Sequence, residues 1–307
     1  MSAVEVREFR RSDRDALAGL VNAHVAAVVP GVVLSVNAVM NQLEREPGEF
    51  IVDPWVRERL TLVAEERGRV VAAALLLRYG DGPQVGEFYR GVGEIRWFTY
   101  WPHVPVGNPH WPDATAAAGM LLAASVLQLE RWGGRQYADG ALPAPGVYGV
   151  PDQWPHLRAL YEEGGFVHVG NTEIVLLGDV AFLESASSGQ PDDRLVARRS
   201  VGINGTRIAA EMRGRQVGYI EVDVCDDHGR SQPRVGFADI GNLQLDDGPD
   251  RTSIAGWLLA EAAKWLRLAG VDRLLTYATD DEADEIAWFE SKGFVQLTRT
   301  MRGWVRA

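Results

Sequence analysis

The sequence predicts an α/β protein whose mixed sheets belong to two related units arranged in tandem. The first observation is an internal repeat: residues 113–122 return at 250–259 with six of the ten positions identical. The second is a later echo, Glu-x-x-Gly-Phe-Val, present at 162–167 and again at 290–295. The third is the length of 307 residues, which is enough for two domains that each bury a core of their own.

A polar run separates the two predicted units. Residues 185–193 are Ser-Ala-Ser-Ser-Gly-Gln-Pro-Asp-Asp, a composition typical of a linker. We therefore expect an N-terminal domain over 1–184, a linker over 185–193 and a C-terminal domain over 194–307.

The first unit alternates between the two-residue period of strands and the wider spacing of helices. It begins with a half-buried strand, and Ser12 or Asp13 then offers a cap for the first helix. In order, we predict a strand at 4–9, helices to about residue 26 and at 33–42, strands at 60–64 and 70–77 around a turn at 66–69, a strand at 94–100, a helix at 115–132, a strand at 136–138, a helix at 154–163, and over 166–177 two strands or one long bent strand.

The second unit repeats this order but omits the first two helices. Its first three strands are joined directly by tight turns at Asn204-Gly205 and Arg213-Gly214. The predicted elements are strands at 195–200, 206–212, 216–224 and 238–245, a helix at 252–269, a strand at 273–277, a helix at 281–291 and a final strand.

Charge and composition exclude several classes of function. The net charge of −11 lacks the basic surface that nucleic-acid binding needs, so no nucleic-acid partner is expected. Cys225 is the only cysteine, which rules out an internal disulfide framework, and the six histidines show no metal-ligand spacing. The charged N-terminus argues against a signal peptide, and the longest apolar stretch is too short to cross a membrane. We expect a cytoplasmic protein without a membrane partner.

Two motifs carry a resemblance to a known family. Residues 159–166, Ala-Leu-Tyr-Glu-Glu-Gly-Gly-Phe, resemble the late-helix signature of the GNAT superfamily of N-acyltransferases. Residues 95–102, Ile-Arg-Trp-Phe-Thr-Tyr-Trp-Pro, are similar to the fourth strand of that family. The resemblance covers nearly the whole chain as two GNAT-like units, and it implies transfer of an acetyl group from acetyl-CoA to an amine.

The repeated segment is the expected cofactor site. A helix N-terminus that follows a strand and small residues presents unsatisfied amides and a positive dipole to a phosphate. The resemblance adds that a bulged fourth strand supplies a backbone amide for the oxyanion and binds the pantetheine arm. The expected cofactor-binding residues are Phe98, Thr99, Tyr100, Asp113, Thr115, Ala116, Ala117, Ala118 and Gly119, and the alternative residues in the second unit are Leu243, Leu245, Arg251, Thr252, Ser253, Ala255 and Gly256.

Both copies of this segment depart from the family. Asp113 and Asp250 stand where the family usually has Gln or Arg, and alanines or Ser253 replace the glycines. An aspartate at this place is also a good cap for its own helix, and we prefer that interpretation for both. The second copy should repel a phosphate more strongly, because Asp246 and Asp247 add negative charge beside Asp250.

Acyl transfer to an amine needs a proton acceptor for the ammonium, a donor for the developing oxyanion and an acid for the departing thiolate. By resemblance, Tyr161 is the acid, and the second unit has Phe289 in its place. Glu94, at the start of the fourth strand, is the candidate proton acceptor. Clustered tryptophans most often pack a core, and we prefer that interpretation here; the alternative is a partly apolar acceptor pocket, which would favour a small-molecule amine as the acceptor.

The leading hypothesis is a tandem N-acetyltransferase that is active in the first unit and transfers the acetyl group directly. One alternative is activity in the C-terminal unit. Another is a non-catalytic protein of this fold that binds CoA or a different ligand.

Overall fold

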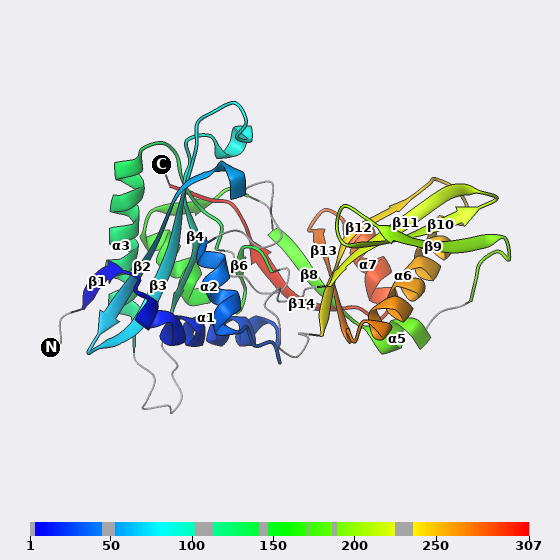
Figure 1. Cartoon of the computed structure of the whole chain (residues 1–307), viewed down its shortest axis with the longest axis horizontal. Helices are drawn as coiled ribbons and strands as arrows, with labels where there is room; N and C mark the ends of the chain where they lie inside the picture. The colour runs from blue at the N-terminus through cyan, green and yellow to red at the C-terminus, as the bar shows by residue number, and fades with distance from the viewer. Residues whose placement is uncertain are drawn as a thin grey trace. The chain divides into compact units, whose positions relative to one another are not determined.

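Two mixed β-sheets organise the chain in the computed structural model, which describes residues 4–44, 53–101, 113–140, 147–170, 172–185, 189–224 and 236–306 (Figure 1). The chain divides into two compact units: unit 1 comprises Met1–Thr172 and Thr300–Ala307, and unit 2 comprises Glu173–Arg299. Over the described ranges, no helix combines the length and the apolar character that crossing a membrane requires.

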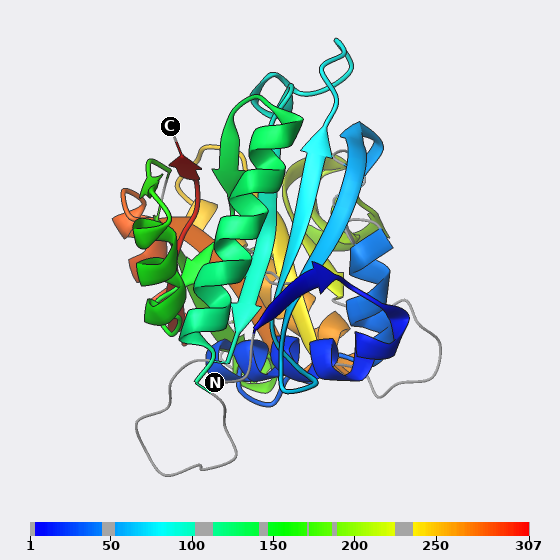
Figure 2. The same cartoon turned by 90° about the vertical axis from the view of Figure 1, so that its left-hand side faces the viewer.

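The sheet of unit 1 has the strand order β1-β2-β3-β4-β5-β15-β7. Helix α3 lies on one face and helices α1 and α2 on the other, and Figure 2 shows α3 running along the sheet. Because both faces are covered, β3 is an almost continuous buried apolar run. The elements are β1 (Glu5–Glu8), α1 (Arg14–Val28), α2 (Val36–Glu44), β2 (Val56–Glu66), β3 (Arg69–Tyr79), β4 (Gly93–Tyr100), α3 (Thr115–Trp132), β5 (Gln136–Ala138), β6 (Val150–Pro151), α4 (Pro155–Glu163), β7 (Phe166–His168) and β15 (Trp304–Arg306).

The long β2–β3 hairpin confirms the turn predicted at 66–69. Its two central residues, Arg67 and Gly68, have φ angles of 53° and 76°. Two consecutive left-handed residues match the right-handed twist of the flanking strands, which is why a glycine belongs in this turn.

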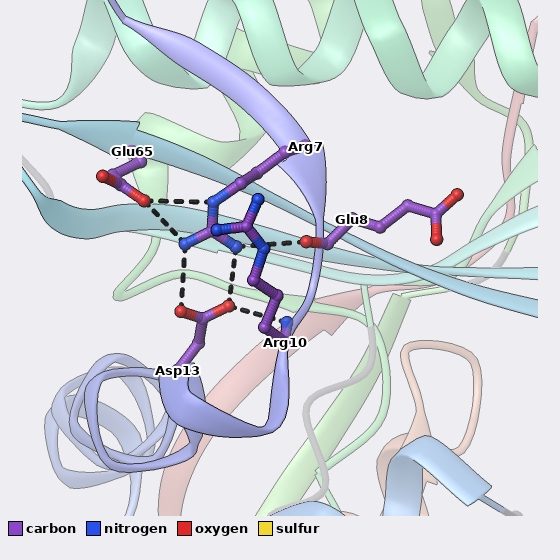
Figure 3. A network of polar contacts seen from close by, with 5 residues as sticks. All are labelled: Arg7, Glu8, Arg10, Asp13 and Glu65. Atoms are coloured by element: carbon purple, nitrogen blue, oxygen red, sulfur yellow. Dashed lines mark hydrogen bonds and ion pairs between the residues drawn. The ribbon is translucent and has the colours of Figure 1, made fainter.

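A polar network fixes the start of the chain to this hairpin (Figure 3). The Arg7 guanidinium donates to Asp13 over 2.7 and 3.0 Å and to Glu65 over 2.6 and 3.0 Å. Asp13 also accepts the backbone N–H of Arg10 at 2.7 Å. The Arg7 guanidinium lowers the pKa of Asp13. One arginine therefore joins β1, the first turn of α1 and β2.

The division into units differs from the predicted domains of 1–184 and 194–307. The chain enters unit 2 with β8 (Thr172–Asp179), before the predicted linker, and it returns to unit 1 at Thr300. Strand β15 pairs with β5 on one side and β7 on the other, and β8 occupies the matching place between β13 and β14. The last strand of each sequence repeat therefore lies in the sheet of the other unit. The predicted domains are continuous segments of the chain, so they do not include this exchange. Part of the predicted linker, 186–188, lies outside the described residues.

Unit 2 confirms the predicted absence of helices between its first two long strands. Strands β9 and β10 form a hairpin directly, with a one-to-one register along both strands. The sheet face away from α6 carries paired polar groups: Arg207 contacts both Glu221 and the ring of Tyr219, so this face does not need an apolar helix. The remaining elements are α5 (Val180–Ser185), β9 (Leu195–Val201), β10 (Thr206–Met212), β11 (Arg215–Val224), β12 (Phe237–Leu245), α6 (Arg251–Leu268), β13 (Arg273–Thr279), α7 (Ala283–Ser291) and β14 (Val295–Met301).

Candidate active site

Strands β4 and β5 separate within unit 1 and form a fork. They pair in parallel only over Gly93–Ile95 and Gln136–Ala138, and the amide of Asp139 then donates to the carbonyl of Ile95 at 3.3 Å. Beyond this point β4 continues to Tyr100, and within the described residues no β5 residue pairs with that part of its edge. Among the strands that the structure describes, none pairs with the backbone groups of β4 on this edge beyond Ile95.

A bulge in β4 lies at the base of the fork. Leu76 faces Ile95, but its neighbour Leu75 faces Trp97, so Arg96 has no opposite residue. A bulge of this kind bends the strand and redirects the groups that follow it. The bulged fourth strand that the family resemblance implied is therefore present.

Glu94 lies fully buried at the base of the fork, on the sheet face opposite α3. Its carboxylate accepts the Tyr79 hydroxyl at 2.5 Å and lies 3.5 Å from Arg96 Nη1. The same Arg96 nitrogen donates to Asp139 Oδ2 at 3.0 Å, and Asp139 Oδ1 accepts the Tyr137 hydroxyl at 3.3 Å. Burial, and then the Glu94 carboxylate, raise the pKa of Tyr79. The predicted proton acceptor thus belongs to an ordered buried network.

Tyr161 flanks the fork from α4 and is also fully buried. Its hydroxyl has no hydrogen-bond partner among the described residues, although its ring packs against Phe166 and Trp304 at 5.6 and 5.8 Å. Burial raises the pKa of Tyr161, and the carboxylates of Asp139 and Glu94 raise it further. A buried hydroxyl without a partner carries a desolvation cost, so a ligand that pairs with it would relieve that cost.

The three predicted cofactor residues on the β4 edge are Phe98, Thr99 and Tyr100, and all are buried. The Thr99 hydroxyl and the nearby Trp97 indole N–H have no hydrogen-bond partner within the described part of the chain. Tyr100 donates to the backbone carbonyl of His156 at the start of α4, at 3.0 Å. A pantetheine arm bound along this edge would therefore have the Thr99 hydroxyl and the Trp97 indole N–H as possible hydrogen-bond partners. It would have to displace the hydrogen bond between Tyr100 and His156.

The predicted phosphate-binding residues lie at the N-terminus of α3. Asp113 Oδ1 accepts the amide of Thr115 at 3.1 Å and its hydroxyl at 2.8 Å. The N-cap residue itself is Ala114, so the aspartate caps the first amide of its own helix from one position earlier than a standard N-cap. Ala116 and Gly119 are exposed, whereas Ala117 and Ala118 are buried against the sheet. The helix end is accessible, but one amide already has an anionic partner.

Unit 2 repeats the fork. Strand β12 pairs with β13 only over Phe237–Asp239, and Gly241 is the bulged residue that matches Arg96. Asp239 stands where unit 1 has Glu94, and burial together with the opposite Asp223 raises its pKa to about 7. Phe289, fully buried in the apolar core of unit 2, replaces Tyr161.

The alternative cofactor residues of unit 2 line a more accessible edge. Leu243 and Leu245 are half-buried on β12, and Arg251, Thr252 and Ser253 are exposed at the start of α6. Ala255 is buried and Gly256 is half-buried one turn later. The prediction that Asp250 caps its helix through its side chain is wrong: Asp250 is the N-cap residue of α6, but its side chain makes no capping hydrogen bond.

Several residues of the unit 1 site were not predicted from the sequence. Tyr79, Arg96 and Asp139 form the network around Glu94, and His24 and His156 place their Nε2 atoms 3.3 Å apart near the end of β4. Arg96 had one available signal, because a charged residue two positions after Glu94 in an apolar strand needs a partner. Across the described residues, no cluster of three or more His, Cys, Asp or Glu side chains could hold a metal ion.

Solved structures with the same architecture are known. A tandem GNAT protein from the clavulanic acid biosynthesis pathway has a TM-score of 0.64 at 14% identity, covering 99% of this chain and 98% of that one. A GCN5-related glucosamine N-acetyltransferase region of a fungal multidomain β-N-acetylglucosaminidase has a TM-score of 0.62 at 13% identity, covering 99% of this chain. This chain spans 38% of that multidomain protein.

A GCN5-related N-acetyltransferase from Sphaerobacter thermophilus has a TM-score of 0.57 at 13% identity, covering 98% of this chain and 94% of that one. No protein-family model matches the sequence, and no curated protein matches it significantly. The chain therefore has the tandem GNAT fold, with one mixed sheet in each unit.

Proposed function

We propose that the protein is an N-acyltransferase that transfers an acetyl group from acetyl-CoA directly to the amine of a small molecule, with unit 1 as the catalytic unit. The observation that carries this proposal is the buried hydroxyl of Tyr161 beside the fork, for which the described part of the chain offers no hydrogen-bond partner. Unit 2 has only Phe289 at the matching position. The fold adds general support, because the structures of similar architecture are N-acetyltransferases.

Acetyl-CoA, when bound, would supply an acyl group activated as a thioester. The residues of unit 1 that would hold it are the edge of β4 from Trp97 to Tyr100 and the exposed N-terminus of α3. Amides on the free edge of β4 provide donors for a developing oxyanion in a water-excluded site, where such donors are most effective. Asp113 opposes a phosphate at α3, so cofactor binding requires its carboxylate to move from the Thr115 amide.

Tyr161 keeps its proton at neutral pH because burial disfavours the phenolate. The same water-excluded environment also disfavours the thiolate form of the departing CoA. The direction of proton transfer therefore depends on the difference between the pKa of Tyr161 and the pKa of the CoA thiol. Glu94 is held ready to accept a proton by Tyr79 and Arg96, on the sheet face that α1 and α2 cover. Acid and base thus approach the fork from different elements.

Two matched substitutions test which unit binds the cofactor. Ala116 and Ser253 occupy the same repeat position, and both are exposed at the start of their helices. A glutamate there would repel phosphate. We expect Ala116→Glu to abolish acetyl-CoA turnover with a panel of small amines and Ser253→Glu to retain it.

Tyr161→Phe tests the chemistry itself. It removes one hydroxyl that has no partner, so we expect the fold to be retained and kcat to fall at least about tenfold. An unchanged kcat would remove Tyr161 from the mechanism. Tyr219→Phe, a hydroxyl deletion in unit 2, is the matched control and should leave kcat unchanged.

The accessible edge of β12 supports a second candidate, in which unit 2 binds the cofactor. Gln244 is exposed on this edge, whereas the corresponding part of β4 is buried. In that case Ser253→Glu, and not Ala116→Glu, would abolish turnover. The Asp113 cap supports a third candidate, a non-catalytic ligand-binding protein, which would show no turnover with any amine.

A further inference from the structure

The end of the chain reaches the base of the fork in unit 1. After β14, which ends at Met301, the chain passes through Arg302 and Gly303 and then forms β15, whose three residues pair with all three residues of β5. Because β5 is short and continues directly into Asp139, this pairing helps to set the position of that carboxylate. Trp304 opposes Ala138 and also packs against the Tyr161 ring at 5.8 Å.

Close backbone packing holds this returning segment in place. A Cβ added to Gly149, whose φ is 89°, would lie 2.7 Å from Arg302 Cγ and 2.9 Å from the Met301 carbonyl. A Cβ added to Gly170 would overlap the Arg302 carbonyl. Only glycine permits such close packing of the backbone at both positions, so the backbone of Arg302 is held in a defined position.

Arg302 completes the charge balance of the buried network. Its Nε lies 3.5 Å from Asp139 Oδ1, and Arg96 holds the other oxygen of the same carboxylate. Two carboxylates, Glu94 and Asp139, are thereby matched by two guanidinium groups. Among the ion pairs of the described residues, Arg96 is the other cation beside these two acids. A buried carboxylate that loses a nearby positive charge is more easily protonated.

We propose that Arg302 is a positioning residue of the unit 1 site: it holds Asp139 from the side opposite Arg96, so that the Arg96 guanidinium, which lies between Asp139 and Glu94, also supports the Glu94 carboxylate as the proton acceptor. This role rests on the proposed function of unit 1. With this role, the last eight residues of the chain, which follow unit 2 in sequence, contribute to the candidate active site of unit 1. Arg302 acts through Asp139 and Arg96 and touches neither reacting group.

Arg306 provides a matched control on β15. Its side chain is 28% exposed, close to the 33% of Arg302, and it bonds Glu130 and the carbonyl of Gly164 instead of a carboxylate at the fork. The titratable and charged groups of the network are Tyr79 on β3, Tyr89 beside it, Glu94 and Arg96 on β4, Tyr137 on β5, Asp139 directly after β5, Tyr161 on α4, and Arg302, whose guanidinium also lies 5.2 Å from the Tyr148 ring.

The experiment compares the pH profiles of kcat/KM for the full-length wild type, Arg302→Ala, Arg302→Lys and Arg306→Ala. We expect the acidic limb to move upward by about one pH unit in Arg302→Ala, because the acid gains a proton more readily when the opposite charge is lost. Arg302→Lys should restore at least half of that shift. Arg306→Ala should leave the limb in place even where it lowers thermal stability.

A superimposable profile for Arg302→Ala, or an equal shift in Arg306→Ala, would overturn the proposal. Carboxyl ¹³C NMR titration of Asp139 and Glu94 compares the same four proteins and does not require catalytic activity. The two signals are assigned with the variants Asp139→Asn and Glu94→Gln. Higher titration midpoints in Arg302→Ala support the role of Arg302 in the network, even where the wild type turns over no amine and the proposed function fails. Unchanged midpoints refute it.

Discussion

Acid should destabilise unit 1 through a buried histidine pair. His24 on α1 donates from Nδ1 to the carbonyl of Leu20 at 2.9 Å, so its Nε2 is an acceptor and faces Nε2 of His156 on α4 at 3.3 Å. The His24 carbonyl also accepts the indole N–H of Trp154. The contact between the rings keeps its one shared proton until both rings are charged, when neither Nε2 can accept. The contact joins α1 to α4, and burial disfavours the charged form of either ring.

The pKa of each ring sets the size and the sign of the effect. Burial lowers the pKa of His24 from 6.5 to about 4, and burial with the neighbouring His24 lowers that of His156 to about 4. Between these values the unfolded chain binds more protons than the folded one, so stability is complete above pH 6.5 and falls as the pH is lowered towards 4. For His24, we expect a loss of about 2 kcal/mol at pH 5 and about 3 kcal/mol at pH 4.

Urea unfolding of the wild type and of His24→Leu at pH 7.5, 6 and 5 measures this loss. The variant should be less stable at pH 7.5 but should depend less on pH below 6.5, because its unfolded state has one fewer site to protonate. NMR titration of the imidazoles checks the cause directly. A His24 midpoint near 6.5, or parallel pH dependence in the two proteins, would refute the reasoning.

Three substitutions test the packing of the two units by chemical denaturation. Arg7→Ala leaves the buried Asp13 carboxylate without its ion-pair partner and should cost about 2–4 kcal/mol; a loss below about 1 kcal/mol would contradict the network in Figure 3. Gly19→Ala adds a methyl group that meets nothing within 4 Å on α1 and should stabilise unit 1 by about 0.5–1 kcal/mol, so any destabilisation would count against the geometry. Glu221→Gln removes the charge that binds Arg207 and the amide of Ile203, and should lower the stability of unit 2 by about 1–3 kcal/mol; an unchanged unfolding midpoint would contradict it.

Much of the fold could be predicted because its signals are local. The repeat at 113–122 and 250–259 starts α3 and α6, and the Arg67-Gly68 turn produces the expected hairpin. The helix predicted at 33–42 is α2, which begins three residues later, at Val36. The exchange of β8 and β15 could not be predicted from local patterns. It depends on which strand pairs between β5 and β7 and which pairs between β13 and β14, and these partners are far apart in the sequence.

The site was predicted less completely, for the same reason. Glu94 and Tyr161 lie at the fork, and Asp113 caps its helix, but the chemical roles of the first two remain predictions. Apart from Arg96 on its own strand, the network around Glu94 takes Tyr79 from β3 and Asp139 from the end of β5, and Arg302 lies far along the chain. Charge balance in a buried network is a property of the folded chain, so sequence spacing does not reveal it.

Calorimetric titration of acetyl-CoA into the full-length protein tests the central claim most directly. We expect about one site per chain with micromolar affinity, and the loss of that site in Ala116→Glu with its retention in Ser253→Glu. No detectable heat, together with no thermal stabilisation by acetyl-CoA, would contradict the account and leave a protein of this fold that binds a different ligand.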